Sequence, residues 1–257
     1  MRLVTFILTG LLAVWGGGAR FASAQSAGDH VAAGDRDHAA RNAQGALAHY
    51  EAALALDSTN SDVLIKAAFD AVDLGEFTPN SEQRTSLFRR GEHYARLAVA
   101  ANPRSAEAHF QLARALGRTA LSLGPRDRVK YAREVRDEAL AALAIESRHA
   151  GALHVMGMWN AEVMRLNAVA RLIAKRFLGG KVFDEANWDS AQRYLEQAVA
   201  ADPDRIVHRL DLGGVLADRH ETAKAIEQLE WVTRAPVSDF NDPNYKKAAE
   251  HRLGELR

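Results

Sequence analysis

The sequence predicts an all-α fold, an α-solenoid built from pairs of helices. Ala is the commonest residue, 49 of 257, and it is the best helix former because its side chain loses no entropy in a helix. A helix ending also recurs along the chain, with small residues at fixed places and a Pro or Ser five residues after the last of them. Such residues let two helices pack closely, and each pair then buries its remaining face against the next pair.

Composition and charge narrow the classes of function. Lys plus Arg number 33, as do Asp plus Glu, so the chain lacks the basic surface that holds phosphates, and no nucleic acid partner is expected. The chain has no Cys, which excludes a disulfide framework, a thiolate nucleophile and a zinc site with Cys ligands. The fold must therefore be stabilised by packing alone.

Residues 1–24 are the first element, and their order is that of a secretory signal peptide. One early charge, Arg2, precedes the apolar run Leu3–Trp15, and Ala22 and Ala24 supply a small-x-small cleavage site. The alternative is an uncleaved N-terminal anchor, although the apolar run is shorter than the ~20 residues that a spanning helix needs. We expect cleavage after Ala24 and export, in the simplest case to a bacterial periplasm. We expect no transmembrane segment after cleavage.

Residues 25–41 are rich in Gly, Asp and His, and we expect a short helix there at best, in a poorly determined N-terminal segment. Residues 42–257 are predicted to form a single solenoid domain. Its helix endings recur at intervals of 34 to 56 residues, the fifth copy being weaker than the other four. The matching positions are Ala46, Tyr50 and Ala53; Gly91, Ala95 and Ala98; Val135, Ala139 and Ala142; Ala191, Leu195 and Ala198; and Ala225, Leu229 and Val232.

Between these endings lie other helices with a small residue at the matching place, in the pairs Ala67-Ala68, Leu112-Ala113, Met156-Gly157 and Leu212-Gly213. The alternation resembles the tetratricopeptide repeat. The last copy has the usual length of 34 residues and the others are longer, which predicts insertions between paired helices. Asp242 as N-cap and Pro243 at the first helical position predict a final helix that caps the array.

A more specific resemblance covers residues 148–235. The segment His154–Trp159 has the pattern His-x-Met-Gly-x-Trp, and it is followed by Arg171–Phe177 and by the helix Trp188–Pro203. This order is similar to the C-terminal half of the regulator of microtubule dynamics family. The resemblance implies tetratricopeptide adaptors that bind other proteins at microtubules or organelle contact sites. It also implies that no member is an enzyme, and that one member is similar to a phospholipid-binding module.

The insertion over residues 163–185 carries an amphipathic pattern. Leu166, Val169, Ala170, Ile173 and Phe177 fall on one helical face, and Arg171 and Lys175 fall on the opposite face. One interpretation is a flap over a groove, or a surface element that touches anionic lipid. The other is that the apolar face packs against its own repeat and leaves the basic residues in solvent. Asn187 is the expected N-cap of the next helix.

The inner face of the solenoid is the expected place for a partner. Tetratricopeptide geometry directs fixed positions of each first helix toward this face. Arg114 and Arg118, one turn apart, can present two guanidinium groups to a carboxylate or phosphate, unless nearby acids such as Glu107 already pair with them. The candidate binding residues are Phe69, Phe110, Arg114, Arg118, His154, Met158 and Glu162 on the inner face, with Arg171 and Lys175 in the insertion; Ile65, Leu210 and Asp218 occupy further inner-face positions.

The sequence carries no pattern that indicates catalysis, a metal or a cofactor. His149 and His154 are about 140° apart on a helix, which is unsuitable for joint metal ligation, and Gly179-Gly180-Lys181 lacks the rest of a phosphate-binding loop. We therefore expect no catalytic residues, no metal site and no cofactor. The predicted function is a non-catalytic, exported adaptor that binds a protein or peptide partner in the inner groove. The alternative is a carrier or sensor of an anionic amphiphile such as a fatty acid or phospholipid.

Overall fold

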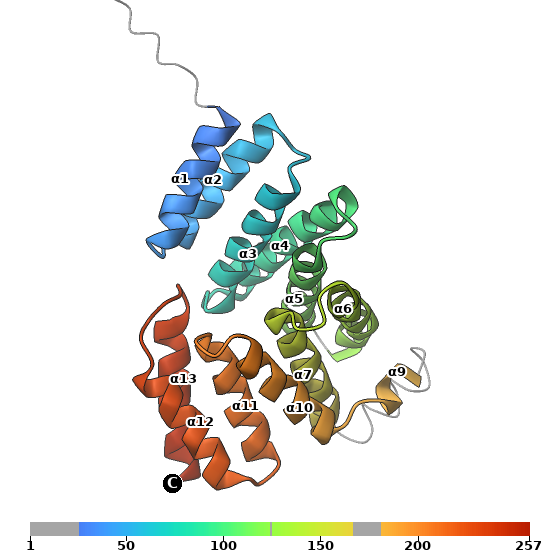
Figure 1. Cartoon of the computed structure of the whole chain (residues 1–257), viewed down its shortest axis with the longest axis vertical. Helices are drawn as coiled ribbons and strands as arrows, with labels where there is room; N and C mark the ends of the chain where they lie inside the picture. The colour runs from blue at the N-terminus through green and yellow to red at the C-terminus, as the bar shows by residue number, and fades with distance from the viewer. Residues whose placement is uncertain (1–25, 124, 167–180) are drawn as a thin grey trace, which may run out of the picture.

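The computed structural model describes residues 26–123, 125–166 and 181–257, and every regular element in these ranges is a helix (Figure 1). The predicted all-α class is confirmed. The helices are α1 Ala27–Ala39, α2 Ala43–Leu56, α3 Ser61–Glu76, α4 Ser81–Ala101, α5 Ala106–Ser122, α6 Pro125–Ile145, α7 Ala150–Arg165, α9 Lys181–Asp184, α10 Trp188–Ala201, α11 Ile206–Asp218, α12 Thr222–Arg234 and α13 Asp242–Leu256.

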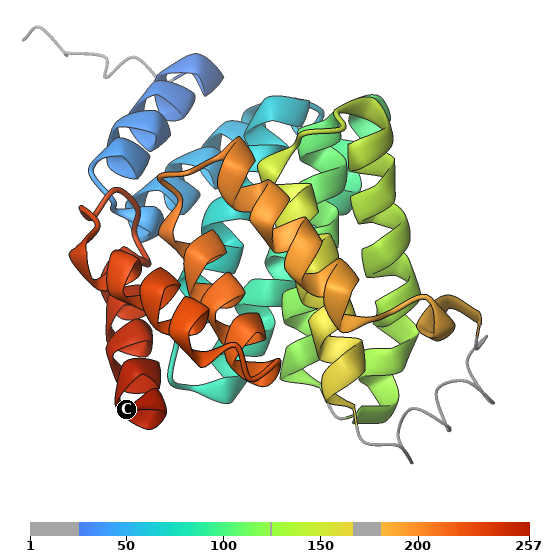
Figure 2. The same cartoon turned by 60° about the horizontal axis from the view of Figure 1, so that its bottom comes forward.

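Successive helices pack as pairs, which is the predicted solenoid. The pairs are α1 with α2, α3 with α4, α5 with α6, α7 with α10, and α11 with α12, and α13 packs on α11 and α12. The first helices of the pairs also contact one another in order, from α3 through α5 and α7 to α11. They form the inner face of a curved array, as Figure 1 and the turned view in Figure 2 show.

The recurring small residues lie where two helices of a pair meet. A Cβ added at Gly91 of α4 would lie 2.6 Å from Val72 Cγ2 of α3. A Cβ added at Gly157 of α7 would lie 2.6 Å from Leu195 Cγ and 3.1 Å from the Ala191 backbone oxygen, both of α10. The helices therefore approach too closely for a larger side chain at these positions.

Side-chain caps fix most of the helix starts. Asn187 accepts a hydrogen bond from the Ser190 backbone N–H at 2.7 Å, which confirms the N-cap predicted for this helix. Asn60 and Asn80 do the same for α3 and α4. At the last helix the cap differs slightly from expectation, because Asn241 precedes α13 and Asp242 is its first residue. The buried Asp242 carboxylate instead accepts hydrogen bonds from the backbone N–H groups of Ser238 and Asp239, both at 2.8 Å.

The N-terminal segment contains a longer helix than expected, α1, with 13 residues. Ser26 and Asp29 form a reciprocal capping box at its start, a signal that the Gly and Asp content obscures. Gly34 is buried against the Tyr50 ring, and the Tyr50 hydroxyl donates to Asp35 at 2.8 Å. These contacts make α1 the partner of α2 in the first helix pair.

The loop between α12 and α13 contacts the N-terminal helices. Arg41, after α1, donates to the Val237 carbonyl at 3.1 Å, and the Asn241 amide donates to the Asp73 carbonyl at 3.0 Å. Figures 1 and 2 both show the loop before α13 beside the N-terminal helices. None of the helices in the described ranges is long and apolar enough to cross a membrane.

Candidate functional site

A cavity of about 200 Å³ lies on the inner face between α5 and α7, with further walls from α6, α9 and α11; we call it the inner cavity. Trp159 and Phe183 stack in its wall with ring centroids 6.4 Å apart. The Trp159 indole N–H donates to the Ala132 carbonyl at 2.7 Å, so the polar edge of the ring is satisfied and the rest of the ring adds apolar surface to the wall. The other apolar lining residues include Leu121, Val135, Val155, Met158 and Val163.

Gly117 of α5 opens this cavity. Of the residues that the structure describes, none comes within 4 Å of a Cβ added at Gly117, although Gly117 is in the middle of a packed helix and lines the cavity. By contrast, a Cβ at Gly151, on the same cavity, would lie 2.4 Å from the Phe110 ring. Among the described residues, the space beside Gly117 is therefore left open because this residue lacks a side chain.

The structure gathers six of the nine sequence-predicted site residues around the inner cavity: Phe110, Arg114, Arg118, His154, Met158 and Glu162. Phe69 lies outside it, with the Arg114 guanidinium 4.8 Å and the Arg205 guanidinium 5.7 Å from its ring centroid. Arg171 and Lys175, with the amphipathic pattern of the insertion, lie outside the described residues.

The two arginines are paired with acids from the neighbouring helix α3. Arg114 donates to Asp73, and Arg118 donates to Glu76. Burial opposes charge on Arg114, but the Asp73 and Glu76 carboxylates outweigh it and raise the pKa of the guanidinium. The acids differ from the expected one, because Glu107 accepts from His149 at 3.0 Å and from Gln111 at 2.7 Å. The arginine charges are thus matched within the protein and do not require an external anion.

A cluster of three polar side chains lines the cavity where α7 meets α11. His154 Nδ1 lies 2.9 Å from His208 Nδ1, and His154 Nε2 lies 3.2 Å from the Asp211 carboxylate. Burial, followed by the nearby His154, lowers the pKa of His208 to about 2, so His208 is neutral at ordinary pH. Burial opposes ionisation of Asp211, but the hydrogen bond from His154 lowers its pKa and keeps it charged. These contacts link the three groups.

Five residues of this site are not marked as site residues by any pattern in the sequence: Trp159, Phe183, His208, Asp211 and Gly117. His154 and His208 are 54 positions apart and meet only because α7 packs on α11. Phe183 lies in the insertion, and the helical period there does not indicate how deeply a side chain is buried. Gly117 carries no side chain, so no residue pattern marks it. The pairing of helices in the solenoid was the only signal in the sequence for this site. It indicates which helices are neighbours, but it does not indicate where their side chains point.

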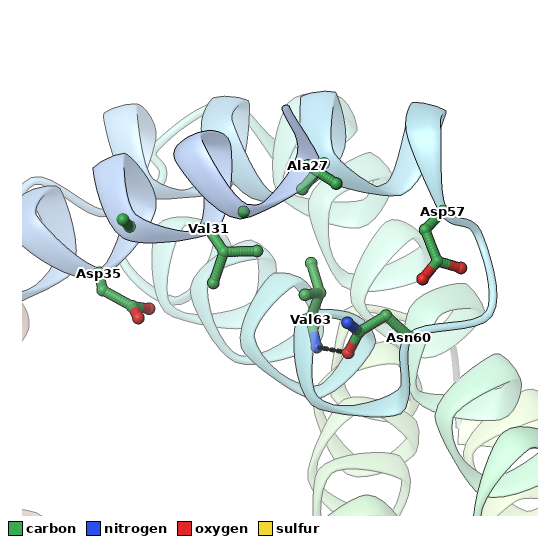
Figure 3. A pocket seen from close by; sticks show the side chains of 9 residues that line it. Ala27, Val31, Asp35, Asp57, Asn60 and Val63 are labelled. Carbon is green, nitrogen blue, oxygen red and sulfur yellow. Dashed lines mark hydrogen bonds between the residues drawn. The ribbon is translucent and has the colours of Figure 1, made fainter. Parts of the chain in front are cut away.

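A second hollow lies near the N-terminal end, between α1, α2 and α3 (Figure 3), with a volume of about 330 Å³. Val31 and Val63 line it, and its polar groups are engaged. Asp35 accepts from the Lys66 ammonium at 2.6 Å, and Asp57 accepts from the Thr59 hydroxyl at 2.8 Å. In the part of the chain that the structure describes, no group of three His, Asp or Glu residues is placed to hold a metal ion.

The arrangement of helix pairs defines a tetratricopeptide-repeat protein. A crystal structure of a thermophilic TPR protein from Thermus thermophilus matches with a TM-score of 0.63 at 18% identity, over 88% of this chain and 100% of that chain. A monomeric mutant of IFIT1, in complex with m7Gppp-AAAA, matches with a TM-score of 0.50 at 18% identity, over 84% of this chain and 51% of that chain. These likenesses show the fold.

The family described as Regulator of microtubule dynamics protein 1-3 matches residues 27–257, and the chain belongs to this family. The match extends well beyond residues 148–235, the part in which the resemblance is visible by eye. No curated protein sequence matches the chain.

Proposed function

We propose that the protein is a non-catalytic, exported adaptor that binds a protein or peptide partner through the inner cavity. The observation that carries this proposal is the cavity beside Gly117, an apolar space on the inner face that no side chain of the described chain fills. Hot spots of protein interfaces are pockets of this kind, into which a partner inserts one large apolar or aromatic side chain.

The size of the cavity favours a single side chain as its occupant. Small-molecule sites have volumes of roughly 300–1,000 Å³, whereas this cavity has about 200 Å³. Glu162 accepts from Arg165 at 2.7 Å, and Arg165 also donates to Asp218 at 2.6 Å, so the rim is polar with its charges matched. A polar rim around an apolar pocket is the usual arrangement of an interface.

The alternative, a carrier of an anionic amphiphile, is favoured by one further observation. Arg128 lines the mouth of the cavity, and its guanidinium donates to the Leu121 carbonyl at 3.0 Å and the Leu123 carbonyl at 3.1 Å. An anionic head beside Arg128, with an acyl chain in the cavity, would suit these groups. Mass spectrometry of an organic extract of the purified protein separates the two functions, because only the carrier yields stoichiometric lipid.

The titratable groups around the inner cavity are paired with one another, and the proposal assigns none of them a catalytic role. His154, His208 and Asp211 hydrogen-bond to one another, and Arg114 and Arg118 are held by Asp73 and Glu76. The family's class of adaptor proteins is the one family property that this proposal includes.

A chain exported from a bacterium would be separated from any cytoplasmic tubulin. N-terminal sequencing of exported protein tests the proposed export and the cleavage after Ala24. A start far from Gln25 would contradict this cleavage.

The binding proposal is tested with a displayed library of random peptides selected on the purified protein. We expect selected peptides to share one large apolar or aromatic residue and to lose affinity at least tenfold when it is replaced by Ala. Gly117→Trp, which fills the cavity, should abolish their binding. Gly254→Trp is the matched control, because an added Cβ at Gly254 of α13 also meets nothing within 4 Å and this residue does not line the cavity. Equal loss in both variants, or in neither, contradicts the proposal.

A further inference from the structure

One nitrogen of the His208 ring lies at the inner cavity without a hydrogen-bond partner among the described residues. His208 lines this cavity and is only 5% exposed. Its Nδ1 contacts His154 Nδ1 at 2.9 Å, but its Nε2 makes no hydrogen bond with any residue that the structure describes. Nε2 is not fully enclosed by the protein either. The accessible part of this buried ring therefore opens into the cavity that it lines.

The hydrogen bonds from Asp211 through His154 to His208 have a fixed direction. Asp211 is ionised, and an ionised carboxylate can only accept hydrogen bonds. His154 Nε2, 3.2 Å from this carboxylate, therefore carries a hydrogen and donates it. A neutral imidazole has one N–H, so Nδ1 of a neutral His154 is an acceptor. The contact at 2.9 Å then requires that His208 Nδ1 donates to His154.

This direction leaves His208 with a lone pair at Nε2. Burial, followed by the nearby His154, lowers the pKa of His208 to about 2, so the ring holds a single proton at ordinary pH. The contact with His154 places that proton on Nδ1. Nε2 is thus a hydrogen-bond acceptor at an apolar cavity. A ligand that expels water from the cavity must donate a hydrogen bond to this nitrogen, because an unpaired polar group removed from water is costly.

The other polar side chains of the cavity do not offer an equivalent acceptor. Arg118 and Arg128 have guanidinium groups, which are donors only. Glu162 lies at the rim with its side chain 39% exposed, where it pairs with Arg165. Asp211 is held by His154. Of the described side chains that line the cavity, His208 is therefore the one whose neutral acceptor is still available to a ligand.

Building on the proposed binding function, on which this inference rests, we propose that the partner inserts a tryptophan or tyrosine side chain and donates its N–H or O–H to His208 Nε2. The apolar wall with the stacked rings of Trp159 and Phe183 contacts the inserted ring. Phenylalanine or leucine fills the same wall but leaves Nε2 unpaired. His208 thus determines the specificity of the site for a ring that carries a donor.

The first test compares indole with indene, two rings of nearly the same shape, of which only indole has a donor N–H. Binding at pH 8 is followed by the 13C-methyl resonance of Met158, which lines the cavity. We expect the wild-type protein to bind indole about tenfold more tightly than indene, or better. Equal affinities for the two rings, or no binding of indole, overturn the proposal.

The matched variant is His208→Asn. The Asn amide takes the place of Nδ1 and keeps a donor for His154, whereas no polar atom reaches the place of Nε2. We expect this variant to bind indole and indene with equal affinity and to keep the wild-type affinity for indene, which shows that the cavity is intact. A preference for indole that stays at the wild-type value in this variant overturns the role of His208.

The wild-type protein with 15N-labelled histidine gives a second measurement that does not depend on the folding of a variant. At pH 8 we expect His208 in the tautomer with its hydrogen on Nδ1. Indole should shift the Nε2 resonance of His208, and indene should shift it much less. A His208 ring that carries its hydrogen on Nε2, or indole binding that leaves the Nε2 resonance unchanged, overturns the proposal.

Peptides selected on the protein distinguish this inference from the proposed function. We expect their anchor residue to be Trp or Tyr, and replacement of an anchor Tyr by Phe should weaken binding about tenfold for the wild-type protein but not for His208→Asn. Peptides that bind through Leu or Phe, equally well to both proteins, would overturn this inference and leave the proposed function intact. Peptides that are insensitive to Gly117→Trp would contradict the proposed function, and the indole comparison would still decide the role of His208.

Discussion

Arg114 of α5 and Asp73 of α3 form an ion pair between two neighbouring first helices of the array, with side chains only 11% and 2% exposed. From the sequence alone, Arg114 was equally compatible with a free guanidinium and with a guanidinium paired to a nearby acid. Two charges removed from water in this way are tolerated because each supplies the other's partner.

Removing one member of this pair should be costly. Arg114→Leu or Asp73→Leu leaves a buried charge without its partner, and we expect each to lower the free energy of unfolding by about 3–5 kcal/mol. The double variant should lose much less than the sum. Urea denaturation of the four proteins measures the coupling, and additive losses would contradict the described pair. Arg234→Ala is the exposed control; its pair with Glu230 should contribute under ~1 kcal/mol.

Two glycines should respond in opposite directions to the same substitution. Gly117→Ala places a Cβ in open space within a helix, and we expect a gain of about 1 kcal/mol because Ala is the better helix former. Gly157→Ala places a Cβ 3.1 Å from the Ala191 backbone oxygen and should destabilise the protein, because α7 and α10 must separate. Thermal and urea denaturation test both. A loss of stability with Gly117→Ala would mean that the cavity beside it is filled.

The pH dependence of stability should contain a contribution from His208. The unfolded chain binds a proton at His208 near pH 6.5, while burial lowers the folded pKa to about 2. Between these values the unfolded state binds more protons, so stability falls as the pH falls below 6.5, by up to about 1.4 kcal/mol per pH unit from this group.

The His208→Leu variant separates this contribution from those of the carboxylates. Its stability, measured by urea denaturation between pH 4.5 and 7, should depend less steeply on pH than that of the wild-type protein. His251→Gln, at an exposed position of α13, is the control for the removal of a histidine. Identical slopes for the wild-type protein and His208→Leu would mean that His208 is accessible to protons in the folded state.

The fold was predictable because its signal is local and repeated. Gly91, Gly157 and Leu195 mark helix contacts whose spacing follows from the helical period, and the structure places them where two helices meet. The start of α1 was missed because the Ser26 and Asp29 capping box is only two residues in a segment of Gly, Asp and His.

The site was predictable only in part, because it depends on contacts between distant helices. Periodicity assigned Phe110, His154 and Met158 to the inner face, where they line one cavity. It gave no information on which acid would meet Arg114, since α3 and α5 carry several acids. The hydrogen bond from the Asn241 amide to the Asp73 carbonyl joins residues 168 positions apart, beyond the reach of any repeat pattern.

The most direct test of the proposed binding function uses the methionine methyl groups. Met158 lines the inner cavity, while Met156, two residues away on the same helix, is buried in a separate cluster. In a spectrum of the protein with 13C-methyl methionine, a selected peptide should shift the Met158 resonance and leave that of Met156 near its position. A peptide that binds tightly and leaves the Met158 resonance unchanged would contradict the inner cavity as the partner site.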